Sequence, residues 1–212
     1  MNRGFFLVVE GPEGAGKTTL AAALGKQFRA MGVEPVLVRE PGGTAVAERV
    51  RSVLLDPSLA VEPVSELYLF LAARADLVSK VIKPALDVGK VVLADRFQLS
   101  TEAYQCGGRG LDLTLFHEAN RAATGGLEPD LTLILELPTE LGFARIRKSG
   151  QPFDRIEQAG PEFHARVANV FRNATGPGLV HLDAALPSEQ VLRLAWGEIE
   201  SRLPGARPAG RD

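Results

Sequence analysis

Nine consecutive residues near the start of the chain have the types and spacing needed to bind a nucleoside triphosphate. They are Gly11, Pro12, Glu13, Gly14, Ala15, Gly16, Lys17, Thr18 and Thr19, which fit the pattern G-x-x-x-x-G-K-[ST]. The glycines allow the backbone to curl so that successive N–H groups point at a phosphate group beside a helix N-terminus. Lys17 can then reach the β- and γ-phosphates, and the Thr18 hydroxyl can bind Mg²⁺. The loop therefore predicts a triphosphate site in which Lys17 is catalytic and Thr18 is a metal ligand.

Asp95 and Arg96 follow an apolar run and could serve the same reaction. An aspartate at the end of a strand can hold Mg²⁺ directly or through water in enzymes with this loop, and an arginine beside it can bind a phosphate group. The plainer interpretation is a surface aspartate at a strand end with a solvated arginine paired to it. The chain has no Asn-Lys-x-Asp sequence to read guanine, which argues against a GTPase.

The elements that must position these residues follow from hydrophobic periodicity. An apolar strand at 5–10 precedes the loop, and apolar side chains at helical spacing follow it from Leu20 to Met31, up to Gly32. Further strands are expected at 36–38, 91–94, 131–135 and 179–182. Further helices are expected at 44–55, where Thr44 can act as the N-terminal cap, and at 64–88 with a change of direction near Pro84. Two more are expected at 98–106 and 112–123, separated by a flexible stretch at 107–110. The last three are expected at 139–147, from after Arg155 to about 173, and at 188–203, with Leu194 on the apolar face of the final helix. Apolar strands alternating with helices predict a three-layer α/β fold of the P-loop NTPase type, with a five-stranded parallel sheet covered by helices on both faces.

Length and composition suit one domain. A chain of 212 residues that is 45% hydrophobic can bury a sizeable core. Residues 1–203 are therefore expected to form a single domain, followed by a Pro-, Gly- and Arg-rich tail at 204–212 that is expected to be disordered. The formal net charge of −2 gives no overall basic field, which argues against nucleic acid and membrane partners.

The cysteine content indicates a reducing compartment. A single cysteine, Cys106, can form neither an internal disulfide nor a cysteine-based metal site. The N-terminus shows no secretory signal and no apolar run approaches 18 residues, so a cytoplasmic location is expected. Cys106 is interpreted as a bystander thiol.

Four more motifs complete the pattern. They are Arg39-Glu-Pro-Gly-Gly-Thr44, Leu69-Phe70-x-x-x-Arg74, Asp95-Arg96-Phe97-x-x-Ser100-Thr101-x-Ala103-Tyr104-Gln105 with Gly108-Arg109-Gly110, and Asp154-Arg155-Ile156-Glu157. Together with the glycine loop, and in this order from about residue 5 to 182, they resemble the bacterial thymidylate kinase family. The resemblance implies ATP-dependent phosphorylation of dTMP to dTDP with Mg²⁺, by direct in-line transfer, in a homodimer.

The resemblance also implies where the acceptor binds. Glu13 matches the family's acidic residue at the 3′-hydroxyl of the sugar, and Tyr104 matches the residue lying where a ribose 2′-hydroxyl would be. Arg39 and Arg96 resemble the pair of guanidinium groups that holds the acceptor phosphate.

The residues matched to the base are Phe70, Arg74, Ser100, Thr101 and Gln105. Phe70 corresponds to the aromatic ring that stacks on thymine, although a ring here could also be plain core. Arg74 and Thr101 correspond to the groups that hydrogen-bond the edge of the base, although a threonine in a helix can instead bond its own backbone. Ser100 and Gln105 are expected to line the same pocket.

One feature of the glycine loop leaves a catalytic charge to be found elsewhere. Some members of the family have an arginine directly after the acidic residue of the loop, where this chain has Gly14. The polar segment at about 147–157 lies between two helices, as expected of a closing lid, so Arg147 or Arg155 could act as an arginine finger. Alternatively both are solvated, or Arg155 pairs with Asp154 or Glu157.

Two other functions remain open from the sequence. One is a kinase for a different nucleoside monophosphate, such as dUMP or dCMP, and the other is a nucleotide-binding regulator that transfers no phosphate. The presence of Lys17, Asp95 and Arg96 argues against the regulator, because pure binding does not require a second phosphate clamp.

Overall fold

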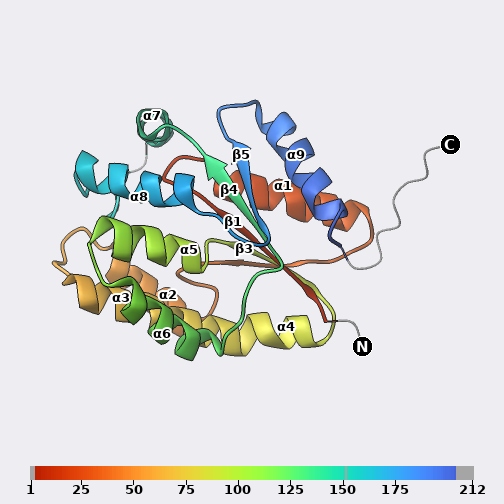
Figure 1. Ribbon diagram of the computed structural model, residues 1–212, viewed down its shortest axis with the longest axis horizontal. Helices are drawn as coiled ribbons and strands as arrows, with labels where there is room; N and C mark the ends of the chain where they lie inside the picture. The colour runs from red at the N-terminus through yellow and green to blue at the C-terminus, as the bar shows by residue number, and fades with distance from the viewer. Residues whose placement is uncertain (1–2, 151, 204–212) are drawn as a thin grey trace.

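The computed structural model describes residues 3–150 and 152–203. Its centre is a five-stranded parallel sheet with the strand order β2-β3-β1-β4-β5. The strands are β1 (Phe5–Glu10), β2 (Val36–Arg39), β3 (Val91–Asp95), β4 (Leu131–Glu136) and β5 (Leu179–Asp183). Helices cover both faces of the sheet (Figure 1). The predicted three-layer α/β fold is therefore confirmed.

The glycine loop follows β1, which is the middle strand of the sheet. All six residues of β1 are buried, and this strand pairs with β3 on one side and β4 on the other. The outer strand β2 pairs only with β3, in a register that sets Arg39 opposite Asp95. The carboxyl ends of these three strands thus bring the loop, Arg39 and Asp95 to one edge, where ligands bind in open parallel sheets.

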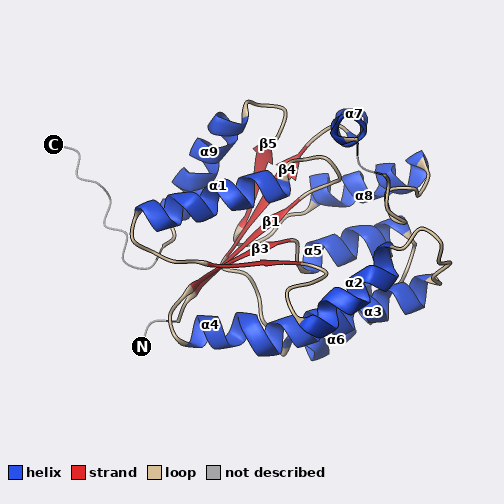
Figure 2. Cartoon of the chain, turned by 180° about the vertical axis from the view of Figure 1, so that it is seen from behind, coloured by secondary structure: helices blue, strands red, loops and turns tan. Residues whose placement is uncertain are grey.

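The helical elements are α1 (Lys17–Ala30), α2 (Ala45–Leu55), α3 (Pro63–Leu77), η1 (Val78–Ile82), α4 (Lys83–Asp87), α5 (Gln98–Thr101), η2 (Glu102–Gly108), α6 (Leu113–Thr124), α7 (Thr139–Ser149), α8 (Pro161–Asn173) and α9 (Ser188–Glu200). In the part of the chain that the structure describes, no helix is long and apolar enough to cross a membrane. Seen from behind, α1 and α9 lie on one side of the sheet and α2, α3, α4 and α6 lie on the other (Figure 2).

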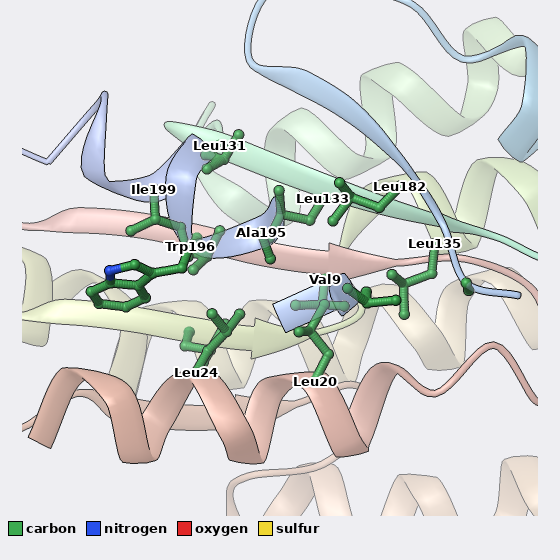
Figure 3. Close-up of a cluster of buried hydrophobic side chains, with 14 of the residues drawn as sticks. Val9, Leu20, Leu24, Leu131, Leu133, Leu135, Leu182, Ala195, Trp196 and Ile199 are labelled. Carbon is green, nitrogen blue, oxygen red and sulfur yellow. The ribbon is translucent and has the colours of Figure 1, made fainter. Parts of the chain in front are cut away.

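One apolar core lies between the sheet and the helices α1 and α9 (Figure 3). Helix α1 contributes Leu20, Leu24 and Phe28, and Trp196 of α9 packs edge-on against Phe28 with the ring centroids 5.1 Å apart. Two residues expected on these buried faces lie outside the core. Met31 follows the end of α1 and is 55% exposed, and Leu194 of α9 is 46% exposed.

The opposite face of the sheet packs against the long helical stretch at 63–87 and against α8. Phe6, Val8 and Val92 contact side chains of α3, η1 and α4, whereas Ile134 joins a cluster with Phe163, Val167 and Phe171 of α8. This alternation along β1 and β4 is the period-two pattern of strands buried on both faces.

Two helical stretches contain π-helical turns that periodicity did not predict. The helical stretch at 63–87 continues through Pro84 without a break. The π-turn η1 ends at Ile82, two residues before this proline. A proline cannot donate its own hydrogen bond, and a wider turn next to it accommodates the missing bond. The predicted helix at 98–106 is π-helical from Glu102 onward and continues to Gly108.

Several predicted boundaries change for reasons of packing. Gly107 and Gly108 belong to η2 and do not form a flexible link, because a Cβ at Gly108 would lie 2.4 Å from the Phe163 ring. Helix α7 extends to Ser149, so Arg147 lies in its last turn rather than in a loop. Helix α8 begins only at Pro161, after turns at 155–159. The predicted tail at 204–212 lies outside the described residues.

The core under α1 generates a stability prediction. Replacing the fully buried Leu24 with alanine should lower the free energy of unfolding by about 2–5 kcal/mol, because it removes apolar contacts and leaves a cavity. Urea titration followed by the fluorescence of Trp196, the only tryptophan, measures this change. The half-exposed Leu194 on α9 is the matched control, and Leu194→Ala should change the value by less than about 0.5 kcal/mol. Equal losses in the two variants would contradict the packing described here.

Candidate active site

A cleft of about 550 Å³ opens at the carboxyl edge of the sheet. Most of the residues predicted to do chemistry line it: Glu13, Gly14, Gly16, Lys17, Thr18, Thr19, Arg39, Phe70, Arg74, Asp95, Arg96, Ser100, Thr101, Tyr104 and Gln105. Gly11, Pro12 and Ala15 belong to the loop but not to the lining, and the same is true of the lid arginines Arg147 and Arg155. The fold thus gathers the loop, the strand ends and the predicted base pocket around one cavity.

The glycine loop holds Lys17 in a position ready for phosphate. Gly16 has a φ of +92°, which a glycine adopts without strain, and α1 begins at the next residue. The Nζ of Lys17 donates to the Pro12 carbonyl at 2.6 Å, and the side chain is buried. Burial, together with the positive charge of Arg96, lowers the pKa of Lys17 to about 8. A bound phosphate would restore the charge that burial disfavours.

The two predicted metal ligands are already in contact. The Thr18 hydroxyl donates to Oδ2 of Asp95 at 2.6 Å, across the gap between the start of α1 and the end of β3. A hydroxyl and a carboxylate at this place fit Mg²⁺, which accepts few protein ligands and completes its shell with water and phosphate oxygens. No group of three or more His, Cys, Asp or Glu side chains in the described chain could hold a metal without such help.

Arg96 is fixed from both its backbone and its side chain. Its φ of +75° makes it the one non-glycine residue with a positive φ among the described residues. Such a conformation is sparsely populated and persists where the surroundings impose it. Its Nη2 donates to Glu13 at 2.8 Å, and Tyr104 donates to the same carboxylate oxygen at 2.7 Å. Burial alone would raise the pKa of Glu13, but Arg96 and Lys17 outweigh it and lower this pKa to about 2.

A buried carboxylate beneath the loop completes the support of Arg96. Glu10 is fully buried and accepts hydrogen bonds from the backbone N–H groups of Phe97 and Ser100 and from the Ser100 hydroxyl. The Ser100 hydroxyl in turn accepts from Nη1 of Arg96 at 3.0 Å. Ser100, predicted to line the substrate pocket, therefore also acts as the bridge that orients Arg96.

Arg74, predicted to meet the base, is 1% exposed and is held by several hydrogen bonds. Its guanidinium donates to Glu40 at 2.6 and 2.8 Å, to Asn120 at 2.7 Å and to Thr101 at 2.8 Å. The Thr101 hydroxyl thus accepts a hydrogen bond from Arg74. The alternative interpretation was a bond from this hydroxyl to the backbone of its own helix. Among the described residues, Nη1 of Arg74 makes one hydrogen bond, to Asn120, although it carries two hydrogens.

Phe70 and Gln105 line the same cleft as Arg74. Phe70 is half-buried and packs against the α8 cluster, so it is partly core and partly pocket wall. Gln105 is 1% exposed and donates from Nε2 to Glu66 at 2.8 Å.

Arg39, predicted to bind the acceptor phosphate, is held by an acid of α2. Its Nη2 lies 3.0 Å from Oε2 of Glu48, which also accepts from the Gly43 backbone N–H. The hydroxyl of Thr44 accepts from the Ala47 N–H and so caps α2, as the sequence predicts. The cap fixes the start of α2 just after Arg39.

Helix α7 packs directly on the glycine loop through two facing glycines. A Cβ on Gly14 would lie 2.2 Å from the Gly142 carbonyl, and a Cβ on Gly142 would lie 2.2 Å from the Glu13 carbonyl. This contact brings Arg145 to the loop, where it donates to the carbonyls of Gly14 and Ala184. An arginine at position 14 would have no room in this arrangement.

The two predicted lid arginines lie in different surroundings. Arg147 is exposed in the last turn of α7, and in the described part of the chain its guanidinium makes no hydrogen bond or ion pair. Arg155 instead pairs with Glu66, with Nη1 2.6 Å from Oε2. The carboxylates of the alternative partners, Asp154 and Glu157, instead accept hydrogen bonds within the turn at 154–158. The Asp154 backbone N–H donates to Glu157, and the Glu157 backbone N–H donates to Asp154.

Sequence reasoning missed the buried acids and two arginines of the cleft. The acids are Glu10, Glu40 and Glu66, and the arginines are Arg51 and Arg145. Glu10 directly precedes the glycine loop, and Glu40 directly precedes Pro41. The signal that could have found them is a charged residue at the end of an apolar strand. Cys106, interpreted as a bystander, has a pKa raised by burial to about 11 and is therefore a neutral thiol near pH 7.

Comparison with known proteins gives a uniform result. Residues 9–194 match the family described as Thymidylate kinase. A thymidylate kinase of Deinococcus radiodurans is 44% identical over 205 residues, which cover 95% of this chain and 99% of that protein. One of Pseudomonas fluorescens (strain Pf0-1) is 49% identical over 192 residues, covering 89% and 91%. One of Synechococcus sp. (strain JA-2-3B'a(2-13)) is 47% identical over 213 residues, covering 98% and 99%.

The lowered pKa of Lys17 predicts a cost in stability. Below a pH of about 8 the folded chain must bury a charged lysine, whereas the unfolded chain keeps the charge up to its ordinary pKa of 10.5. Lys17→Met should therefore raise the free energy of unfolding by up to about 3 kcal/mol at pH 7, because one pKa unit corresponds to about 1.4 kcal/mol.

This gain should shrink as the pH rises from 8 towards 10.5, since native Lys17 then becomes neutral in the folded state while it stays charged in the unfolded chain. Urea titrations at pH 7 and pH 10 measure the difference. Lys26→Met, on the exposed side of α1, is the control and should show no such change. A gain at position 17 that is the same at both pH values would show that charge burial is not its cause.

Proposed function

This chain belongs to the thymidylate kinase family and phosphorylates dTMP to dTDP with ATP, and we propose that it does so by direct in-line transfer in the cleft described above. The observation that carries the proposal is the convergence of Lys17, Arg96 and Glu13 at the sheet edge. Transfer of a phosphoryl group depends mainly on positioning and charge stabilisation, so no covalent intermediate is required. The shared name of the relatives favours neither another monophosphate kinase nor a non-catalytic regulator.

The donor phosphates are proposed to lie on the loop from Gly11 to Thr19. Its N–H groups and the N-terminus of α1 would cradle the β-phosphate, and Lys17 would leave the Pro12 carbonyl to meet the γ-phosphate. The Thr18–Asp95 contact supports the assignment of both residues to Mg²⁺. When bound, this ion would neutralise charge on the phosphate oxygens.

The acceptor is proposed to lie across the cleft, with its phosphate on Arg39 and Arg96. Glu13 would accept a hydrogen bond from the sugar 3′-hydroxyl, and Tyr104, whose hydroxyl is already bonded to Glu13, would lie where a ribose 2′-hydroxyl would be. Phe70 would stack on thymine, and Arg74, Thr101 and Gln105 would meet its edge, which their places in the lining support.

Gly14 cannot supply the positive charge that some family members place in the loop. We assign this charge to an arginine of α7 or of the lid. Arg147 has a free guanidinium in the described chain but, two residues beyond Arg145 on α7, it points to a different side of the helix from the contact with the loop. A movement of the end of α7 would bring Arg147 towards the transferring phosphoryl group. Arg155 would have to leave Glu66 to take the same part.

The chain is further proposed to form a homodimer and to act in the cytoplasm. Exposed apolar side chains at Val46 and Val53 of α2 and at Val64 and Tyr68 of α3 form a surface suited to a homodimer. The use of ATP and the single neutral thiol fit a cytosolic enzyme.

The kinase reaction gives the first activity prediction. In an assay coupled to ADP release with Mg·ATP, dTMP should be a better acceptor than dUMP, dCMP, dGMP or AMP. Lys17→Ala should lower kcat at least about 100-fold, because it removes a charge that is needed most in the transition state. Lys26→Ala is the control on the same helix and should keep native turnover. If no monophosphate stimulated ADP release by the native protein, the proposed function would be wrong.

The lid gives the second activity prediction. An arginine finger contributes roughly 10³–10⁵-fold to turnover, so Arg147→Ala, alone or with Arg155→Ala, should lower kcat far more than it raises the KM for dTMP. Lys148→Ala, at the neighbouring exposed position of α7, is the matched control and should change kcat little. Retention of kcat within a few-fold by the double variant would place the source of the charge elsewhere, with Arg145 the next position to test.

A further inference from the structure

One buried carboxylate joins the base pocket to the lid. Glu66 of α3 is fully buried, and its two oxygens receive three side chains, two from the end of η2 and one from the lid turn. Oε1 accepts from Gln105 at 2.8 Å and from Nε of Arg109 at 3.1 Å. Oε2 accepts from Nη2 of Arg109 at 3.1 Å and from Nη1 of Arg155 at 2.6 Å. No part of the phosphoryl transfer described above uses this carboxylate.

The contact with Glu66 fixes which end of Gln105 faces the cleft. A carboxylate can only accept hydrogen bonds, so Gln105 must present its NH₂ group to Glu66. Its carbonyl oxygen is then left for a donor on a bound base, such as the ring N–H of thymine. The position of Glu66 therefore decides whether Gln105 can recognise that group.

Arg155 docks the lid turn at the same place. Its Nε donates to the Leu54 carbonyl at 2.7 Å, and its backbone N–H donates to the Leu55 carbonyl at 3.2 Å, both at the end of α2. Its neighbours Asp154 and Ile156 line the cleft. The pairing of Arg155 with Glu66 thus sets where the lid wall of the cleft lies.

The charges of the cluster make Arg155 the partner that can leave. Arg109 binds both oxygens of Glu66 and also lies over the Phe163 ring, 4.5 Å from its centroid. If Arg155 departs, Glu66 keeps this two-point pair, and a buried charge without a partner is avoided. Nη2 of Arg155 is buried without a hydrogen-bond partner, which further weakens its hold on the cluster.

We infer that Glu66 is a positioning residue that couples occupancy of the base pocket, sensed at Gln105, to docking of the lid through Arg155. A base that holds Gln105 in place also holds the Glu66 carboxylate, and so favours the docked lid. This inference rests on the proposed function, since it requires that Gln105 meet the base of dTMP. Coupling between sites is reciprocal, so lid docking must tighten dTMP binding by the same factor.

Hydrogen exchange of the lid measures this coupling without catalysis. Exchange of backbone amides at 153–159 would be followed by mass spectrometry with and without dTMP, and binding of dTMP would be measured separately by calorimetry. In the native protein dTMP should slow lid exchange roughly 5-fold or more, the lower end of typical coupling between sites. In Arg155→Met, which leaves the Glu66–Arg109 pair intact, this effect should vanish and the Kd for dTMP should rise by a similar factor.

Glu66→Gln provides the second test, because Gln105 can still bond the new amide while both arginines lose their charged partner. It should bind dTMP without protecting the lid, and Arg155→Met keeps the test valid if this variant does not fold. Arg166→Ala is the matched control, since Arg166 bonds the Gly107 and Gly108 carbonyls beside the cluster but does not touch Glu66. It should keep native coupling.

Each remaining outcome is decisive. If the native protein binds dTMP but its lid exchange does not change, or if Arg155→Met shows the native effect, the coupling is refuted and the kinase function stands. If the native protein does not bind dTMP at all, both the function and the coupling are refuted.

Discussion

The arrangement of this cleft depends on pairing between buried carboxylates and arginines. A site for two phosphorylated substrates needs several cations in a cavity of low polarity, and each would destabilise the fold if it lacked a partner. Arg96 is held by Glu13 and, through Ser100, by Glu10, whereas Arg74 is held by Glu40. The cations are thereby oriented before any substrate binds, which lowers the entropy lost on binding.

The same pairing explains why the sheet and the loop must be placed as they are. Glu10 ends β1 and Glu40 follows β2, so the acids arrive at the carboxyl edge with the strands themselves. The facing glycines 14 and 142 then let α7 approach the loop, and Arg145 takes part of the space that a loop arginine would need. Lys17 is only partly compensated by the nearby acids, as its lowered pKa indicates, and a phosphate group would complete its pairing.

Much of this could be predicted from the sequence because it depends on local patterns. The glycine loop, the five strands, the Thr44 cap and the motif from Asp95 to Gln105 are short-range signals, and the structure brings their residues together. The partners of the arginines could not be predicted, because Glu66 and Arg155, or Glu40 and Arg74, are distant in sequence and meet only through packing. The π-turns were missed for a related reason, since periodicity does not distinguish a wider helical turn that packing imposes.

The most direct test of this account is the ¹⁵N NMR spectrum of the arginine Nε–H groups in the ligand-free protein. Arg74 and Arg109 donate from Nε to buried carboxylates, so their signals should be sharp and exchange slowly with water at neutral pH. The signal of the exposed Arg147 should exchange fast, and Glu40→Gln should accelerate exchange at Arg74 alone. Signals of Arg74 and Arg109 that exchanged as fast as that of Arg147 would contradict the claim that the cleft is organised before its substrates arrive.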